Sequence, residues 1–232
     1  MINVRKSQER GNFNHGWLKT SHTFSFSDYY DPKHMGFRAL RVINEDYVAA
    51  SEGFPTHGHR DMEIITYIIS GALEHKDTIG THSTIIPGEV QYMSAGKGIR
   101  HSEFNHLKDQ ETHLLQIWIV PDQEAHTPRY GQKSFLPQFE KKNFVLTISP
   151  DGREDSIAIH RDAYLWVGKP KVNEVIEYSM KPGRYSWVQL VKGSITLNGT
   201  PLTAGDGAAL RDEPQLKIIA ASEAEFLLFD LD

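Results

Sequence analysis

The segment Gly53–Gly71 reads GFPTHGHRDMEIITYIISG and decides the fold that we expect for the chain. It contains His57 and His59 with one residue between them, followed by an apolar run that ends at Gly71. Successive side chains of a β-strand point to opposite faces of a sheet, so both histidines are predicted to share one face. Glu63 joins them on that face if the strand continues without a break.

A second segment, Gly96–Asn105, reads GKGIRHSEFN. The same alternation places His101, Glu103 and Asn105 on one face of a strand. A glutamate on the apolar side of a small barrel is costly unless it is paired or bound to a metal. The two segments together therefore predict a divalent metal site. The chain has 12 histidines, however, so the His-x-His pattern alone would also arise by chance.

Composition narrows the class of protein. The 232 residues include 39% hydrophobic and 24% charged residues, which is enough for a sizeable core and argues against disorder. The formal net charge is -5, and lysine and arginine do not cluster, so we expect no direct binding of nucleic acid. A protein partner remains compatible with this charge.

The chain has no cysteine, which excludes disulfides, thiolate zinc sites and cysteine nucleophiles. Any metal must therefore be held by nitrogen and oxygen. The first residues, MINVRKSQERGNFNHGW, lack the apolar region of a secretory signal, and the apolar runs are too short to span a membrane. A cytoplasmic protein without a membrane association is the expectation.

Glycine-punctuated apolar strands recur in both halves of the chain. ITYIISGALEHKDTIG at residues 65–80 resembles WVQLVKGSITLNG at residues 187–199, as stacked antiparallel hairpins would. We expect an all-β protein of two antiparallel β-barrels with few short helices. Residues 1–130 form the metal-binding barrel, and residues 131–232 form a barrel without a metal site, since its one histidine is His160. Proline-rich residues 121–142 are predicted to link the two.

Other residues near the predicted site receive structural interpretations. Asn44-Glu45-Asp46 is predicted to form a tight turn, and Phe24, Phe26 and Trp118 are assigned to the core rather than to a substrate wall. Gln116 and His113 lie on opposite faces of the predicted strand 112–120, and either one could approach the metal.

The paired motifs resemble those of the cupin superfamily. The first motif is carried by Gly53, His57, His59, Glu63 and Gly71, and the second by Gly98, His101 and Asn105. The stretches HTFSFSDYYDPKHMGFRALRVINED, THGHRDMEIITYIISG and SAGKGIRHSEFN narrow the resemblance to the pirins, which are bicupins with one functional lobe. The resemblance is strong over residues 1–120 and weak beyond them. It implies that both barrels are of the cupin type.

The resemblance to pirins also implies one metal ion, usually iron(II), bound by His57, His59, His101 and Glu103. In the general cupin pattern the first-motif glutamate is the carboxylate ligand, and Glu63 occupies that place here. The alternation of side chains permits either glutamate. Glu63 is then expected beside a ligand, orienting a histidine or a metal-bound water. Nickel, copper, manganese and zinc also suit nitrogen and oxygen donors.

Some pirins resemble quercetin 2,3-dioxygenases in activity. By that resemblance the expected function is cleavage of a flavonol such as quercetin with dioxygen and release of carbon monoxide, with Glu103 or Glu63 as the catalytic base. Two alternatives remain open at this point. One is a metal- or redox-responsive regulator that binds a protein partner, and the other is a metal-dependent isomerase or lyase.

Overall fold

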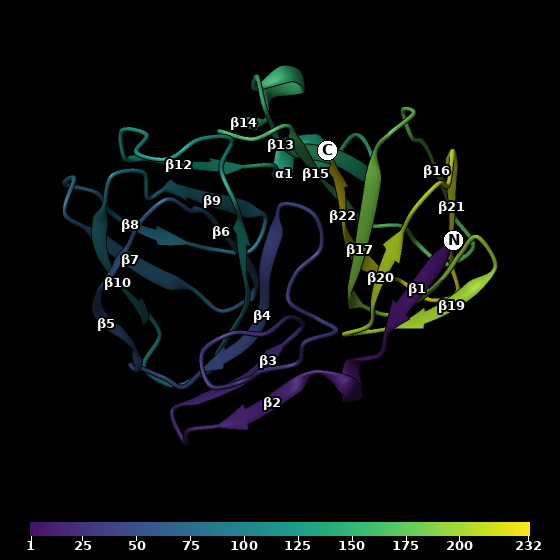
Figure 1. Ribbon diagram of the computed structural model, residues 1–232. Helices are drawn as coiled ribbons and strands as arrows, with labels where there is room; N and C mark the ends of the chain where they lie inside the picture. Colours follow the sequence, from purple (N-terminus) through teal and green to yellow (C-terminus); the bar gives the residue numbers. More distant parts are fainter. The chain divides into compact units, whose positions relative to one another are not determined.

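The computed structural model describes residues 1–232, and almost every regular element in it is a β-strand (Figure 1). The helices are one short α-helix, α1 (Leu136–Phe139), and two 3₁₀ turns at Ser7–Glu9 and Arg153–Asp155. All strand pairs are antiparallel except the short pair β13 and β14. The predicted all-β class with few short helices is therefore confirmed.

The chain divides into two compact units. The first unit comprises residues 11–135 and 159–161, and the second comprises residues 1–10, 136–158 and 162–232. The expected boundary after residue 130 falls inside strand β12 (Arg129–Ser134), which pairs with a strand of the first unit. His160, which the sequence assigned to the second barrel, belongs to the first unit. The division of roles between two domains stays a prediction.

The first unit has a seven-stranded sheet in the order β12-β9-β6-β11-β4-β3-β2 and a four-stranded sheet in the order β5-β10-β7-β8. Its strands are β2 (Gly11–Asn14), β3 (Leu18–His22), β4 (Leu40–Val48), β5 (Gly53–His59), β6 (Glu63–Ser70), β7 (Leu73–Asp77), β8 (His82–Ile85), β9 (Glu89–Ser94), β10 (Ile99–Asn105), β11 (Thr112–Ile119) and β12.

The second unit repeats this plan with the sheets β1-β20-β17-β22-β15-β13-β14 and β16-β21-β18-β19. Its strands are β1 (Ile2–Arg5), β13 (Phe144–Ser149), β14 (Ile157–Ala158), β15 (Ala163–Gly168), β16 (Val175–Ser179), β17 (Tyr185–Lys192), β18 (Ser194–Leu197), β19 (Thr200–Thr203), β20 (Gly207–Leu210), β21 (Gln215–Ala220) and β22 (Glu225–Leu231). The first strand of the chain, β1, therefore pairs with β20, which lies near its end.

Apolar side chains fill the interior of each unit. Leu18, Ile68, Leu73 and Leu114 belong to one buried cluster of the first unit, drawn from both of its sheets. Strand β6 is buried on both faces from its first residue to Ile69, as expected for a central strand with neighbours on either side. The second unit has its own core of buried side chains, among them Val188, Leu197, Leu210, Ile218 and Phe226.

Two local predictions were wrong. Residues 44–46 do not form a turn, because β4 continues through them with β3 and β11 paired on its two sides. Sheet pairing outweighs the local turn preference of Asn and Asp there. Part of the predicted linker, residues 129–134, is strand β12 instead, paired with β9.

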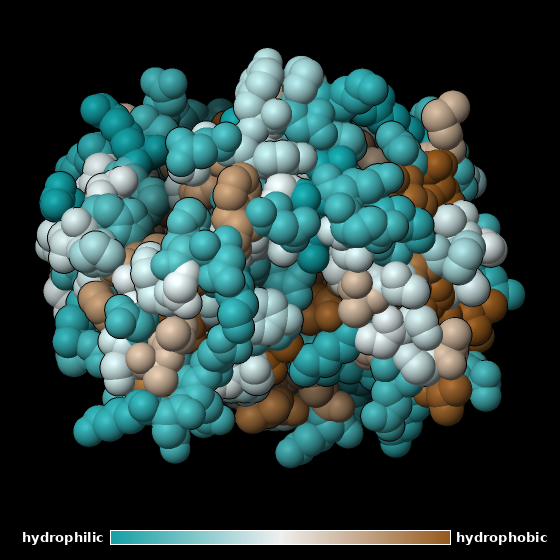
Figure 2. Space-filling view, turned by 90° about the horizontal axis from the view of Figure 1, so that it is seen from below, coloured by the Kyte–Doolittle hydropathy of each residue, from teal (hydrophilic) through white to brown (hydrophobic).

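The surface of the molecule is mostly polar. Figure 2 shows one face on which hydrophilic residues dominate and hydrophobic residues gather in separate groups. None of the helices has the length and apolar character that a membrane crossing requires.

Candidate metal centre

Two antiparallel strands bring the predicted histidines together. His57 of β5 is paired directly with His101 of β10, and His59 is paired with Ile99. The register of the pair shifts between His101 and Glu103, where β5 has one residue more than β10. A Cβ atom on Gly53 would lie 2.2 Å from the backbone oxygen of Glu103, so only glycine fits this position. This first-motif glycine therefore allows the two histidine strands to pair.

The three imidazoles form one cluster. The donor atoms of His57, His59 and His101 all lie within 4.8 Å of one another. The Nε2 atoms of His57 and His101 are 3.1 Å apart. Two nitrogens that bind one ion at about 2.1 Å and near a right angle are separated by about 3 Å. The spacing of this pair thus suits two ligands of a single metal.

Hydrogen bonds to the outer ring nitrogens fix which nitrogens face the cluster. Nδ1 of His57 lies 2.8 Å from the carbonyl oxygen of Pro55, to which it must donate. Nε2 of His75 lies 3.1 Å from Asp77, so Nδ1 of His75 is left as an acceptor 3.4 Å from Nδ1 of His101. His101 then donates through Nδ1. Both Nε2 atoms therefore point lone pairs at each other, an arrangement that a cation between them would stabilise.

His59 and His101 stay uncharged at neutral pH. Burial, together with His57 and His75, lowers the pKa of His101 to about 3. Burial, together with His101 and His57, lowers the pKa of His59 to about 4. Neutral imidazole is the form that binds a metal, so the site needs to lose no proton from these two side chains first.

Glu103 lies beside this cluster and is almost completely buried, with 3% of its surface exposed. Its carboxylate accepts hydrogen bonds from the Gln116 amide at 3.0 Å and the Thr66 hydroxyl at 3.5 Å. No cationic side chain pairs with it. A carboxylate oxygen of Glu103 and ring nitrogens of His75 and His101 all lie within 4.8 Å of one another. Glu103 does not form such a group with His57 and His59. The four-ligand set predicted from the sequence stays a prediction.

Glu63 lies in neither group. The strand breaks after His59, and Asp61 adopts a left-handed φ of 49°, so the predicted alternation does not carry through to Glu63. Its buried carboxylate accepts hydrogen bonds from the Tyr92 hydroxyl, from Ser94 at 2.7 Å and from the backbone N–H of His160 at 2.9 Å. Glu63 was expected to orient a histidine ligand or a metal-bound water, but none of these hydrogen bonds joins it to the histidine cluster.

A cavity of about 350 Å³ opens beside the histidines. His57, His59 and Glu103 line it together with aromatic side chains. Trp118 stands perpendicular to His59, with ring centroids 5.0 Å apart, and Phe26 packs edge-on against Trp118. Trp118 packs against a buried core cluster, as its assignment to the core predicted, but Trp118 and Phe26 also form a wall of this cavity.

Polar residues that the sequence interpretation missed also line the cavity. Asn44 and Asp46 are buried, and each has a side-chain oxygen, Oδ1, without a hydrogen-bond partner. Burial is the main cause that raises the pKa of Asp46 to about 7; nearby Glu103 adds to it, and the Thr20 hydroxyl opposes it. Alternation along residues 40–48 was the signal that could have placed both side chains inward.

The choice between Gln116 and His113 is now settled. Gln116 lines the cavity and holds Glu103, whereas His113 pairs with Glu45 at 2.9 Å on the other face of β11. His75 and Asp77 were missed because they lie in a polar stretch that resembles a surface strand. Both side chains are completely buried.

The donor set fits a divalent ion. Imidazoles converge beside a buried carboxylate that has no cationic partner, and no sulfur donor is present. Such nitrogen and oxygen donors suit iron, nickel, copper, manganese or zinc. The chain has two similar β-units, and one of them holds a cluster of histidines without any cysteine. This combination places the protein in the class of cupin-type metalloproteins.

Comparison with known proteins identifies the family within this class. The family model described as Pirin matches residues 3–119, and the model described as the quercetinase C-terminal cupin domain matches residues 146–231. The chain belongs to the pirin family.

Two similar proteins carry the name of an enzyme, quercetin 2,3-dioxygenase. The quercetin 2,3-dioxygenase of Escherichia coli (strain K12) is 47% identical over 231 residues, which cover 100% of this chain and 99% of that protein. A putative quercetin 2,3-dioxygenase of Pseudomonas aeruginosa is 44% identical, over 100% of both chains.

The fold matches a solved pirin. The crystal structure of the bacterial pirin YhhW from Escherichia coli in complex with nickel(II) has a TM-score of 0.95 and 47% sequence identity, over 100% of this chain and 99% of that one. This match confirms the predicted cupin-type fold.

Proposed function

We propose that the protein is a metal-dependent dioxygenase that cleaves a flavonol such as quercetin with dioxygen and releases carbon monoxide. The observation that carries the proposal is the convergence of three imidazoles beside a buried carboxylate without a cationic partner, at the side of a cavity with aromatic walls. The activity named for the Escherichia coli relative, 47% identical along the whole chain, supports the same reaction.

His57, His59, His101 and Glu103 are the proposed metal ligands. Iron(II) is the metal that we propose, and the nickel(II) complex of the similar pirin supports a divalent ion of this kind. When bound, the ion would supply a Lewis acid and a template for the substrate oxygens. His75 and Asp77 act behind His101, because their hydrogen bonds orient its ring and keep Nε2 free for the metal.

Glu103 is the proposed base for the 3-hydroxyl group of the flavonol. A carboxylate that leaves a ligand position can take this proton, and Gln116 keeps it in place by donating to its oxygens. Glu63 is engaged by three hydrogen bonds elsewhere, so the structure offers no contact through which it would act as base.

The cavity walls would hold the substrate rings. Trp118 and Phe26 provide apolar ring faces and edges against which a planar flavonol can pack. The unpartnered oxygens of Asn44 and Asp46 would meet hydroxyl groups of the substrate. A buried polar atom without a partner costs about 1–3 kcal/mol, which a substrate hydroxyl would recover.

The decisive experiment follows quercetin and dioxygen together. Protein reconstituted with iron(II) or nickel(II) should consume both, release carbon monoxide, and leave quercetin unchanged under anaerobic conditions. His101→Gln should abolish the activity, and His113→Gln, on the opposite face, should retain it. A metal-loaded protein that depletes neither quercetin nor dioxygen would contradict the proposal.

No observation favours the regulator, isomerase or lyase alternatives over this reaction. A protein partner whose capture changes with the oxidation state of bound iron would support the regulator. Turnover of a substrate without dioxygen uptake would support an isomerase or lyase.

A further inference from the structure

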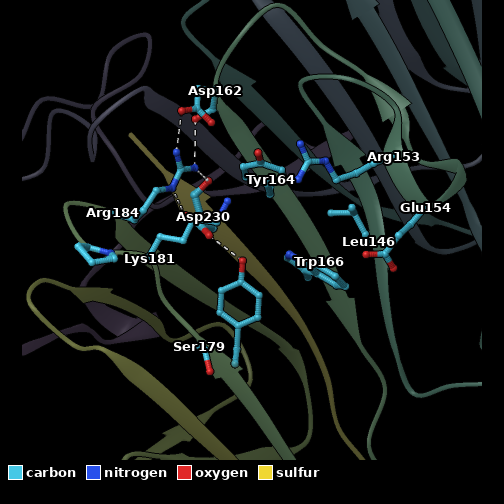
Figure 3. A pocket seen from close by; sticks show the side chains of 12 residues that line it. Leu146, Arg153, Glu154, Asp162, Tyr164, Trp166, Ser179, Lys181, Arg184 and Asp230 are labelled. Atoms are coloured by element: carbon cyan, nitrogen blue, oxygen red, sulfur yellow. Dashed lines mark hydrogen bonds and ion pairs between the residues drawn. The ribbon is translucent and has the colours of Figure 1, made fainter.

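The charges around the cavity of the second unit cancel one another. Three cationic and three anionic side chains line this cavity of about 320 Å³. Figure 3 shows Arg184 bonded to both Asp162 and Asp230, and its ion pair with Asp162 measures 2.8 Å. Because these charges are balanced within the protein, this cavity selects no charged ligand.

A cavity of the first unit differs, because its lining charges all have one sign. It has a volume of about 420 Å³ and is open to solvent. Its charged side chains are those of Arg60, Lys97 and Arg100, and no aspartate or glutamate lines it. All three residues are exposed. These three residues form the basic patch.

Carboxylates elsewhere in the protein neutralise little of the basic patch. Arg60 pairs with the neighbouring Asp61 at 3.3 Å. Lys97 and Arg100 form no ion pair, and the Arg100 guanidinium donates to the backbone oxygen of Thr56 at 3.4 Å. Three cations against one carboxylate leave a net positive charge of two. This positive region lies in a chain whose formal net charge is -5.

The basic patch borders the aromatic cavity beside the histidine cluster. His59 lines both cavities. Thr56, whose backbone oxygen accepts the hydrogen bond from Arg100, also lines the aromatic cavity. The charges of the basic patch therefore act over a short distance on a ligand bound in the aromatic cavity.

The aromatic cavity has no lysine or arginine of its own. Its lining carboxyl groups are those of Asp46 and Glu103, and both would oppose an anionic ligand when they are ionised. The proposed divalent ion would offset Glu103. The basic patch supplies the side-chain charge that would offset the other carboxylate, because a cluster of one sign beside a cavity raises the local concentration of ligands of the opposite sign.

We propose that the basic patch determines specificity by favouring flavonols in an anionic form. This inference deepens the proposed function and rests on it. A phenol at position 7 of a flavonol is conjugated with the ring carbonyl and is acidic, so it ionises while the 3-hydroxyl group keeps the proton that Glu103 would take. The basic patch would strengthen the binding of this anion without touching the reacting atoms.

Anaerobic titration of the nickel-loaded protein at about pH 8.5 tests the proposal, because it measures binding without turnover. The matched ligands are 3,7-dihydroxyflavone, whose 7-hydroxyl group is ionised, and its 7-methyl ether, in which that group is blocked. Quenching of tryptophan fluorescence gives the two dissociation constants. Wild-type protein should bind the dihydroxyflavone more weakly as salt screens the basic patch than the methyl ether does, relative to the variants below.

Lys97→Glu is the main variant, because it changes the charge of the patch by two units at an exposed side chain. A unit charge about 8 Å from a ligand in water changes its binding about twofold at 0.01 M ionic strength. Kd for the dihydroxyflavone should therefore rise about fourfold in Lys97→Glu at 0.01 M, and less than about 1.5-fold at 0.5 M. Kd for the methyl ether should not change.

Two control variants separate charge from structure. Lys97→Arg keeps the charge and should retain the wild-type Kd. Lys108→Glu makes the same charge reversal at an exposed lysine beyond the opposite end of β10, and should leave the Kd of the dihydroxyflavone nearly unchanged. Melting curves establish that each variant is folded.

The proposal is wrong if Lys97→Glu affects the two flavonols alike, if Lys108→Glu has the same effect as Lys97→Glu, or if neither flavonol binds. Because these outcomes come from anaerobic binding, they do not depend on turnover. A protein that shows the expected charge dependence of binding but never consumes dioxygen would support the role of the basic patch and contradict the proposed reaction.

Discussion

The Nε2 atoms of His57 and His101 lie 3.1 Å apart on strands that pair these two residues directly. Each imidazole donates its only proton outward, His57 to Pro55 and His101 to His75. Two lone pairs at this distance repel one another unless a positive ion lies between them. The protein therefore holds these histidines in an arrangement that metal binding would stabilise.

Removal of one of these imidazoles should prevent metal binding without unfolding the chain. His101→Gln takes away a central donor, so metal content after reconstitution should fall from near one ion per chain to near none. Inductively coupled plasma mass spectrometry measures it, and circular dichroism checks the fold. His113→Gln is the matched control, because His113 pairs with Glu45 on the opposite face of β11. Unchanged metal content in His101→Gln would contradict the proposed ligand set.

The hydrogen bond from His75 to Asp77 should matter for affinity although neither residue is a proposed ligand. In Asp77→Asn the side-chain oxygen can still accept the N–H groups of Ile79 and Thr81, but His75 loses its negative partner. Affinity for nickel(II) should fall about 10- to 100-fold, with little change in melting temperature. Competition with a chromophoric chelator gives the affinity. If Asp77→Asn binds nickel(II) as tightly as the wild type, Asp77 does not position His101.

Residues whose places depend on strand alternation alone were predictable from the sequence. His57 and His59, and His101 and Glu103, share faces because period-two alternation is local. Glu63 was not predictable, because a left-handed backbone at Asp61 breaks the strand and resets the alternation.

Asp46 and His75 were also missed, for a different reason. Their local sequences resemble a turn and a surface strand. Alternation puts Asp46 on one face with Asn44, but the pairing of distant strands decides that this face is buried. The all-β class and the paired hairpins, by contrast, follow from glycine spacing and apolar runs that are visible in the chain itself.

Asp46 should reduce the stability of the metal-free protein as pH rises. Folding raises its pKa from 3.8 to about 7, so the folded state retains a proton that the unfolded state has lost. Between pH 4 and 7 this difference costs stability progressively, up to about 4 kcal/mol. Asp46→Asn has no carboxyl group at this position and does not lose this stability. The free energy of unfolding of Asp46→Asn, relative to that of the wild type, should therefore grow from about pH 4 to pH 7 and then level off.

Urea unfolding of metal-free wild type and Asp46→Asn at several pH values measures this advantage. The lowered pKa values of His59 and His101 make both proteins less stable as pH falls from about 6.5 towards 4, and this effect cancels in the difference. A difference that is constant across the range would show that Asp46 titrates normally.

Trp118 should affect substrate binding more than metal binding. Trp118→Leu removes the ring that packs against His59 and Phe26, so KM for quercetin should rise about three- to tenfold. Metal content should not change. Steady-state kinetics with the metal-loaded variant measures the effect, and Trp166→Leu in the second unit serves as the control. Equal KM values for wild type and Trp118→Leu would exclude this ring from the substrate wall.

Anomalous scattering from crystals of the metal-loaded protein, recorded at the absorption edge of the bound metal, would locate the ion and its ligands. We expect one strong peak in the first unit, about 2.0–2.2 Å from nitrogens of His57, His59 and His101 and from an oxygen of Glu103. A peak held by other residues, or no peak in the first unit, would contradict it.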